Sequence, residues 1–151
     1  MKPLVVLIVV FIATLAIDKL ITGNFDYALA GNIAMSAMLV LTAFGHFRFA
    51  DGMANMLPPS IPRRKEIILS TGVIEIAAAA GLLIPSLQYI TACLLILFFI
   101  VVLPANISAA LRHINYQEGT TNGPGTVYLW FRVPLQILFI VWVYYFAIYP
   151  R

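Results

Sequence analysis

The feature that most constrains this chain is an apolar run, Ile67 to Pro85, that carries one acidic residue, Glu75, near its middle. About 20 apolar residues are enough for a helix to cross the hydrocarbon core of a bilayer. A carboxylate at that depth is costly, so it faces a bundle interior or a cavity and has a partner. Small residues from Ala77 to Gly81 follow the acid and let neighbouring helices approach closely. We therefore expect the other helices to be arranged around Glu75.

The composition extends this expectation to the whole chain. Hydrophobic residues make up 62% of the 151 residues and charged residues only 10%, whereas about a quarter of a soluble domain is charged. The sequence therefore predicts an integral membrane protein, with the lipid bilayer as its surroundings and a single transmembrane domain over residues 1–151. No basic and aromatic patch outside the apolar runs indicates nucleic acid. Cys93 is the only cysteine, which excludes an internal disulfide and a cysteine-rich metal site.

Five apolar runs predict five spans, over residues 3–22, 27–49, 67–85, 89–111 and 126–147. The predicted fold is an all-α membrane helical bundle, a four-helix core with one additional N-terminal transmembrane helix. The first run also has the length of a signal-peptide core, and residues 28–30 resemble a cleavage site. We expect a retained span, because the polar gap before that site is too long for ordinary processing. Pro104 is expected to interrupt the fourth span near its end.

Basic residues predict the orientation of these spans. Cytoplasmic loops carry an excess of Lys and Arg. One side of the five-span arrangement would hold Lys2, Arg48, Arg63, Arg64, Lys65 and Arg112, and the other only Lys19 and Arg151. We therefore expect a multi-pass protein with its N-terminus in the cytoplasm and its C-terminus outside.

Polar residues on four different spans are predicted to meet in the cytoplasmic half of the bundle. A helix rises 1.5 Å per residue, so position along each span gives an approximate depth. The residues that fall at similar depths are His46, Glu75, Asn106, Arg132 and Gln136. A buried Arg beside a carboxylate is a common pairing, so we expect Arg132 to extend toward Glu75. Two interpretations remain open: a structural network that fixes helix register, and a pocket for a small lipophilic or anionic molecule.

Cofactor motifs are scarce in the sequence. The two histidines, His46 and His113, both fall near the cytoplasmic side, which makes bis-histidine haem ligation conceivable. His113 lies beside Arg112 at a helix end, however, where a cation favours the helix dipole, and we do not favour haem. No metal-binding or phosphate-binding motif is present. We identify no cofactor, and quinone binding is left open.

Several short elements, taken together and in order, resemble the DoxX-like family of small bacterial membrane proteins. The elements are His46-Phe47, the Pro58 and Pro62 segment, Gly72 with Glu75, Pro104-Ala105-Asn106, and Arg132 with Pro134 and Gln136. The resemblance covers residues 36–147 and implies a four-helix membrane bundle in a bacterial inner membrane, to which the first span is an addition. Relatives in that family include subunits of a thiosulfate–quinone oxidoreductase and accessory factors in the maturation of redox enzymes.

Three functional hypotheses follow. The first is an accessory or assembly factor, or a binder of a small lipophilic molecule. The alternative is a quinone-linked oxidoreductase subunit of the thiosulfate–quinone type, which would need a redox partner protein because the chain has no evident electron carrier. A transporter is less favoured, since no internal repeat is visible. No nucleophile–base pair can be identified from spacing, so the sequence does not decide whether the chain is an enzyme. Homo-oligomerisation is left open.

Overall fold

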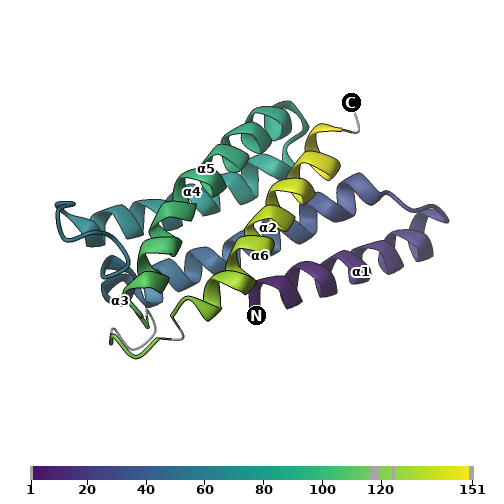
Figure 1. Ribbon diagram of the computed structural model, residues 1–151. Helices are drawn as coiled ribbons and strands as arrows, with labels where there is room; N and C mark the ends of the chain where they lie inside the picture. The colour runs from purple at the N-terminus through teal and green to yellow at the C-terminus, as the bar shows by residue number, and fades with distance from the viewer. Residues whose placement is uncertain (1, 116–119, 124, 150–151) are drawn as a thin grey trace.

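The computed structural model describes residues 2–115, 120–123 and 125–149, and its elements over these ranges are all helices. They are α1 (Lys2–Thr22), α2 (Tyr27–Arg48), α3 (Ala50–Ala54), α4 (Arg64–Leu83), α5 (Pro85–Leu111), α6 (Val127–Val143) and the π-helical η1 (Tyr144–Ile148), as Figure 1 shows. The prediction of an all-helical chain is confirmed. Arg151, used above for the orientation, lies outside the described residues.

Five of the helical segments are long and apolar enough to cross a membrane. They are Lys2–Thr22, Tyr27–Arg48, Arg64–Leu83, Pro85–Leu111 and Leu129–Ile148. Each corresponds to one of the five spans predicted from the sequence. Their apolar faces are widely exposed, since even the most enclosed of the five has only half of its most apolar window buried. Helices that are apolar on the outside as well as the inside are typical of bilayer-spanning segments.

Helix α1 lies at the edge of a bundle formed by α2, α4, α5 and α6 (Figure 1). It packs mainly along α2, and Leu7 is its only buried residue among those described. Phe11 adds an edge-to-face contact with Trp142, with ring centroids 5.0 Å apart. The other helices pack in neighbouring pairs, α2 with α4, α4 with α5, and α5 with α6. The helix that carries Glu75 is therefore enclosed between α2 and α5.

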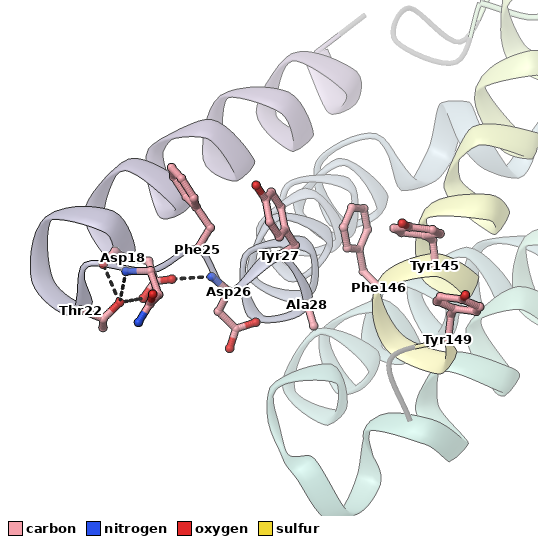
Figure 2. Close-up of a pocket in the computed structure, with 10 residues that line it drawn as sticks. Asp18, Thr22, Phe25, Asp26, Tyr27, Ala28, Tyr145, Phe146 and Tyr149 are labelled. Atoms are coloured by element: carbon pink, nitrogen blue, oxygen red, sulfur yellow. Dashed lines mark hydrogen bonds between the residues drawn. The ribbon is translucent and has the colours of Figure 1, made fainter.

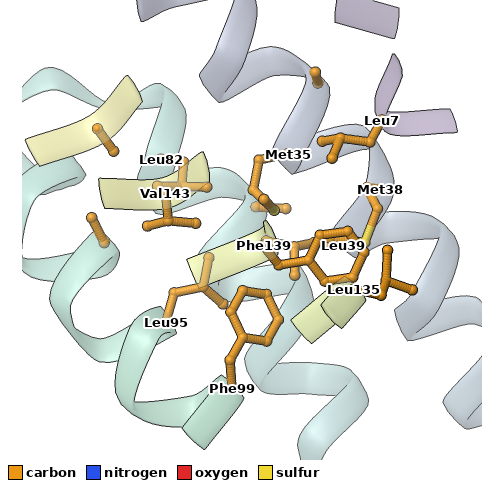
Figure 3. Close-up of a cluster of buried hydrophobic side chains, with 14 residues drawn as sticks. Leu7, Met35, Met38, Leu39, Leu82, Leu95, Phe99, Leu135, Phe139 and Val143 are labelled. Carbon is orange, nitrogen blue, oxygen red and sulfur yellow. The ribbon is translucent and has the colours of Figure 1, made fainter. Parts of the chain in front are cut away.

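The hydrophobic core occupies the middle of this bundle. Figure 3 shows side chains from α1, α2, α4, α5 and α6 converging there, among them Leu7, Met35, Met38, Leu39, Leu82, Leu95, Phe99, Leu135, Phe139 and Val143. Most of these side chains are fully buried. Protein interiors are close-packed, with a density similar to that of organic crystals. Polar side chains lie on both sides of this core along the bundle axis.

Helix boundaries differ from the predicted spans at the prolines. Pro85, expected to end the third span, is instead the first residue of α5, a position that suits proline because its missing N–H would have no partner there. Helix α5 also continues through Pro104 to Leu111, so the expected interruption is absent. Helix α4 begins at Arg64, three residues before the predicted start. The basic pair Arg64-Lys65 therefore belongs to a helix rather than to the preceding loop.

At the end of the bundle near η1, four polar side chains each donate a hydrogen bond to a backbone carbonyl on another helix. Asn32 donates to Phe146 at 3.3 Å, Ser36 to Ala79 at 2.9 Å, Gln88 to Ala147 at 3.4 Å and Trp142 to Gly31 at 3.0 Å. Two of the acceptors lie within the π-helix, whose wider turn does not satisfy its carbonyls in the α-helical way. We call these four bonds the η1-end contacts.

Candidate functional site

At the opposite end of the core, Glu75 on α4 lies beside His46 in the last turn of α2. The distance from His46 Nε2 to Glu75 Oε1 is 3.5 Å, and both side chains are largely buried, at 17% and 7% exposure. The sequence predicted Arg132 as the partner of Glu75. Among the ion pairs of the described residues, Glu75 is joined to His46 and not to Arg132.

The change of partner has a local cause in Gly72. A Cβ atom at this position would lie 3.0 Å from the Cβ of His46 and 3.2 Å from the ring of Phe47. Because Gly72 has no side chain, α2 and α4 approach closely at this level. Gly72 lies three residues before Glu75, on the same face of α4. Because of this close approach, the His46 ring lies against the carboxyl group of Glu75, in the place predicted for the longer Arg132 side chain from α6.

Thr71 fixes the orientation of the His46 ring. Its hydroxyl donates a hydrogen bond to the carbonyl of Ile68 at 2.6 Å and also lies 3.1 Å from His46 Nδ1. A hydroxyl has one hydrogen to donate, so the hydrogen-bond network assigns the proton of the second contact to Nδ1, which donates to Thr71. Nε2 then faces Glu75 Oε1 at 3.5 Å.

Asn106 and Gln136 form the second part of the polar layer, between α5 and α6. Asn106 Nδ2 donates to Gln136 Oε1 at 3.5 Å, and Gln136 Nε2 donates to the carbonyl of Phe99 at 2.6 Å. Both side chains are buried. The accepting carbonyl lies one turn before Pro104, where the proline weakens the ladder of helical hydrogen bonds. These two hydrogen bonds therefore satisfy a backbone carbonyl as well as side-chain groups.

Two buried polar atoms in the described part of the chain have no hydrogen-bond partner, and both belong to the predicted site. They are Glu75 Oε2 and Arg132 Nε. A buried donor or acceptor without a partner costs about 1–3 kcal/mol, and more for a charged group. Native proteins contain few such atoms, and each one calls for an explanation. Glu75 Oε2 is a carboxyl oxygen, and Arg132 Nε is an N–H donor.

All five side chains predicted from the sequence line one cavity of about 370 Å³. Helix α2 contributes His46, α4 contributes Glu75, α5 contributes Asn106, and α6 contributes Arg132 and Gln136. The remaining wall is mainly apolar, with Met38, Met53, Met56, Phe98, Phe99 and Phe139 among its residues. A mostly apolar cavity with a few convergent polar groups is the usual form of a small-molecule site.

Sequence reasoning missed four polar residues of this site. Lys2, Thr42 and Arg48 also line the cavity, and Thr71 orients His46. Thr71 could have been found, because it lies four residues before Glu75 and therefore shares its helix face. Lys2 could not, because its position depends on how α1 packs along α2. His113, considered with His46 as a haem ligand, is not part of the cavity wall.

A second hollow, of about 630 Å³ and wide open, lies between the α1–α2 turn and η1 (Figure 2). Its acidic side chains are used in local structure. Asp26 caps α2 by accepting from the backbone N–H of Leu29 at 2.8 Å, and Asp18 accepts from the backbone of Asp26 at 2.6 Å. Polar groups that already serve the backbone leave this hollow without a chemical signature, and we assign no site to it.

Comparison with known families places the chain in one of them. Residues 35–147 match the family described as a domain of unknown function, DUF8561, so the chain belongs to this family. The matched segment begins within α2 and ends within η1, so it includes all five predicted site residues and leaves α1 outside. No curated protein and no solved structure matches the chain.

Proposed function

We propose that this protein is a multi-pass membrane protein that binds a small lipophilic molecule in the cavity around Glu75. One observation carries the proposal: the two buried atoms without partners, Glu75 Oε2 and Arg132 Nε, belong to residues that line the same apolar cavity. A ligand that brings polar groups to both atoms would remove this cost. Five helices long and apolar enough to span a bilayer support the setting.

The orientation proposed from the loop charges puts this cavity in the cytoplasmic half of a bacterial inner membrane. Lys2, Arg48, Arg64 and Lys65 lie at the ends of α1, α2 and α4 that meet beside it. The ligand would then enter from the inner leaflet or from the cytoplasm. The resemblance to the DoxX-like family agrees with this setting and remains a proposal on the residues that carry it.

The experiment is native mass spectrometry of the protein extracted gently from its own membrane. Wild type is compared with Glu75→Gln and Arg132→Gln, and with Ser36→Ala as a matched control from the η1-end contacts. We expect a discrete bound species that is retained by the wild type and by Ser36→Ala and is lost from the other two variants. A bare wild-type protein, or a species retained equally by all four, would contradict the proposal.

A quinone-linked oxidoreductase subunit is the second candidate, and the Glu75–His46 pair favours it. A quinone head group takes up protons on reduction, and this pair places two titratable side chains in contact at the cavity wall. The mass of the bound species separates a quinone from other lipophiles. A redox partner protein would still be required, since the chain offers no evident electron carrier.

A third role, as an accessory or assembly factor that docks a membrane partner or a second copy, is supported by the exposed small residues of α4. Ala77 and Ala80 are exposed on the helix that carries Glu75, and small residues favour close helix contact in membranes. This role is compatible with ligand binding, because the exposed residues are not among those that line the cavity. Cross-linking at Ala80→Cys in native membranes, with Cys93 replaced by Ser, would reveal a neighbour.

A further inference from the structure

The charges around the cavity restrict the head group of its ligand. Three cations line the cavity, Lys2, Arg48 and Arg132, against one carboxyl group, Glu75, which lies 3.5 Å from His46. Helix α5 contributes Asn106, which does not titrate. The wall therefore carries an excess of positive charge, and an anion or a group that becomes one would be stabilised there, most strongly where water is excluded.

The two atoms without partners restrict the head group further. Arg132 Nε–H is a donor and requires an oxygen that accepts. Glu75 Oε2 is a carboxyl oxygen and can accept from an O–H donor. A head group that offers both an O–H donor and an acceptor oxygen can therefore serve both atoms. A carboxylic acid offers both, whereas an ester lacks the donor and an alcohol has no second oxygen for Arg132.

The size and the wall of the cavity restrict the rest of the ligand. Its volume of about 370 Å³ is near the lower end of the 300–1,000 Å³ range of ligand sites. Phenylalanine and methionine side chains form the apolar wall, and methionine adapts readily to flexible chains. A single unbranched chain or a small ring suits such a space better than a two-chain lipid.

We propose that the cavity binds a single-chain lipophilic carboxylic acid, whose O–H group donates a hydrogen bond to Glu75 Oε2 and whose carbonyl oxygen accepts one from Arg132 Nε. This inference rests on the proposed binding function and names the ligand class for it.

The test measures binding of tritium-labelled decanoic acid to the protein in phosphatidylcholine nanodiscs by a scintillation proximity assay, with empty nanodiscs as background. Unlabelled 1-decanol and methyl decanoate serve as competitors of matched chain length. We expect the acid to compete at least tenfold better than either, which corresponds to about 1.4 kcal/mol.

The dependence of affinity on pH tests whether the acid binds together with its proton. In the wild type, one proton enters the site with each carboxylate, so the dissociation constant should rise about tenfold per pH unit from pH 6.5 to 8.5. The groups facing Glu75 across this cavity are His46 and Arg48 on α2, Arg132 on α6 and Lys2 on α1. His46→Gln reports the part of the slope due to the imidazole. Glu75→Gln replaces the carboxyl group that accepts the acid's O–H with an amide and should weaken binding at every pH, in line with the loss of the bound species in native mass spectrometry.

Arg132 is tested by two variants. Arg132→Gln removes the charge and should weaken binding about 10–100-fold, the size of one or two charge-assisted hydrogen bonds. Arg132→Lys keeps the charge and should lose less affinity, which separates a folding defect from loss of the head-group contact.

Equal competition by decanol would overturn the inference and leave lipophile binding intact. Failure of decanoic acid to bind, or binding indifferent to both Glu75 and Arg132, would also overturn it. The proposed function is overturned as well only by native mass spectrometry, through a bare wild type or a species that all four proteins retain equally.

Discussion

Two polar regions lie in the bundle, one on each side of its hydrophobic core. They share amide side chains but differ in whether all of their buried polar atoms have hydrogen-bond partners. At the η1-end contacts, each of the four side chains donates to a carbonyl on a neighbouring helix. In the layer around Glu75, the Asn106–Gln136 chain is satisfied in the same way, but Glu75 Oε2 and Arg132 Nε are not. The first region contains no ionisable side chain, whereas the second contains both members of a protonatable pair.

This difference separates structural polar contacts from a site. Hydrogen bonds between helices hold a bundle together when both groups are satisfied. A buried ionisable side chain with an unsatisfied atom lowers the stability of the protein. Proteins retain such a side chain where it binds a ligand. The mainly apolar cavity around Glu75 lies on the side where the cost is found, and the open hollow at the η1 end has acidic groups that already serve the backbone. The comparison therefore predicts that mutations in the two regions affect different measurements.

The largest stability effect is expected from Gly72→Val, which would break the close approach of α2 and α4. The added side chain would press on His46 and Phe47, and such overpacking typically costs about 1–3 kcal/mol of unfolding free energy. Steric-trapping measurements of unfolding in bilayer discs would report this loss. Gly45→Ala is the matched control, because a Cβ there would meet only the flexible end of Met53 at 3.8 Å, and we expect it to be neutral or slightly stabilising. Equal losses in both variants would contradict this role of Gly72.

The same glycine shows where sequence reasoning reached its limit. Lengths of apolar runs and a rise of 1.5 Å per residue were sufficient to predict five helices and to bring His46, Glu75, Asn106, Arg132 and Gln136 to one level. Depth along a helix does not determine rotation about its axis or the distance between axes. Those depend on close approaches such as the one at Gly72, which decided that His46 and not Arg132 lies against Glu75.

Prolines mark a second limit. The sequence predicted a break at Pro104, but α5 continues, because one missing hydrogen bond does not by itself end a helix that is held by its neighbours. The Gln136 side chain, which satisfies the carbonyl of Phe99 nearby, comes from another helix. Such tertiary compensation cannot be read from the order of residues in α5.

An intermediate effect is expected from Ser36→Ala, which removes one of the η1-end contacts. Its hydroxyl donates to the carbonyl of Ala79 at 2.9 Å in a buried position. Interhelical bonds of this kind contribute about 0.6 kcal/mol on average and up to about 1.7 kcal/mol. The unfolding free energy should fall by that amount, while ligand capture in native mass spectrometry stays unchanged. Ser70→Ala is the control, because Ser70 is exposed and bonds only within its own helix. Loss of ligand in Ser36→Ala would show that the two regions are not independent.

The smallest stability effect is expected from Glu75→Gln, although Glu75 contacts His46 and lines the cavity. The substitution keeps the shape of the side chain and replaces a buried carboxyl group whose second oxygen has no partner. The gain from removing this unsatisfied carboxyl oxygen offsets the weakened contact with His46. We therefore expect the unfolding free energy of the ligand-free protein to change by less than about 0.5 kcal/mol or to rise. A loss above about 1 kcal/mol would instead class Glu75 with Ser36 as a structural contact, and the cavity around it would then be a by-product of packing and not a binding site.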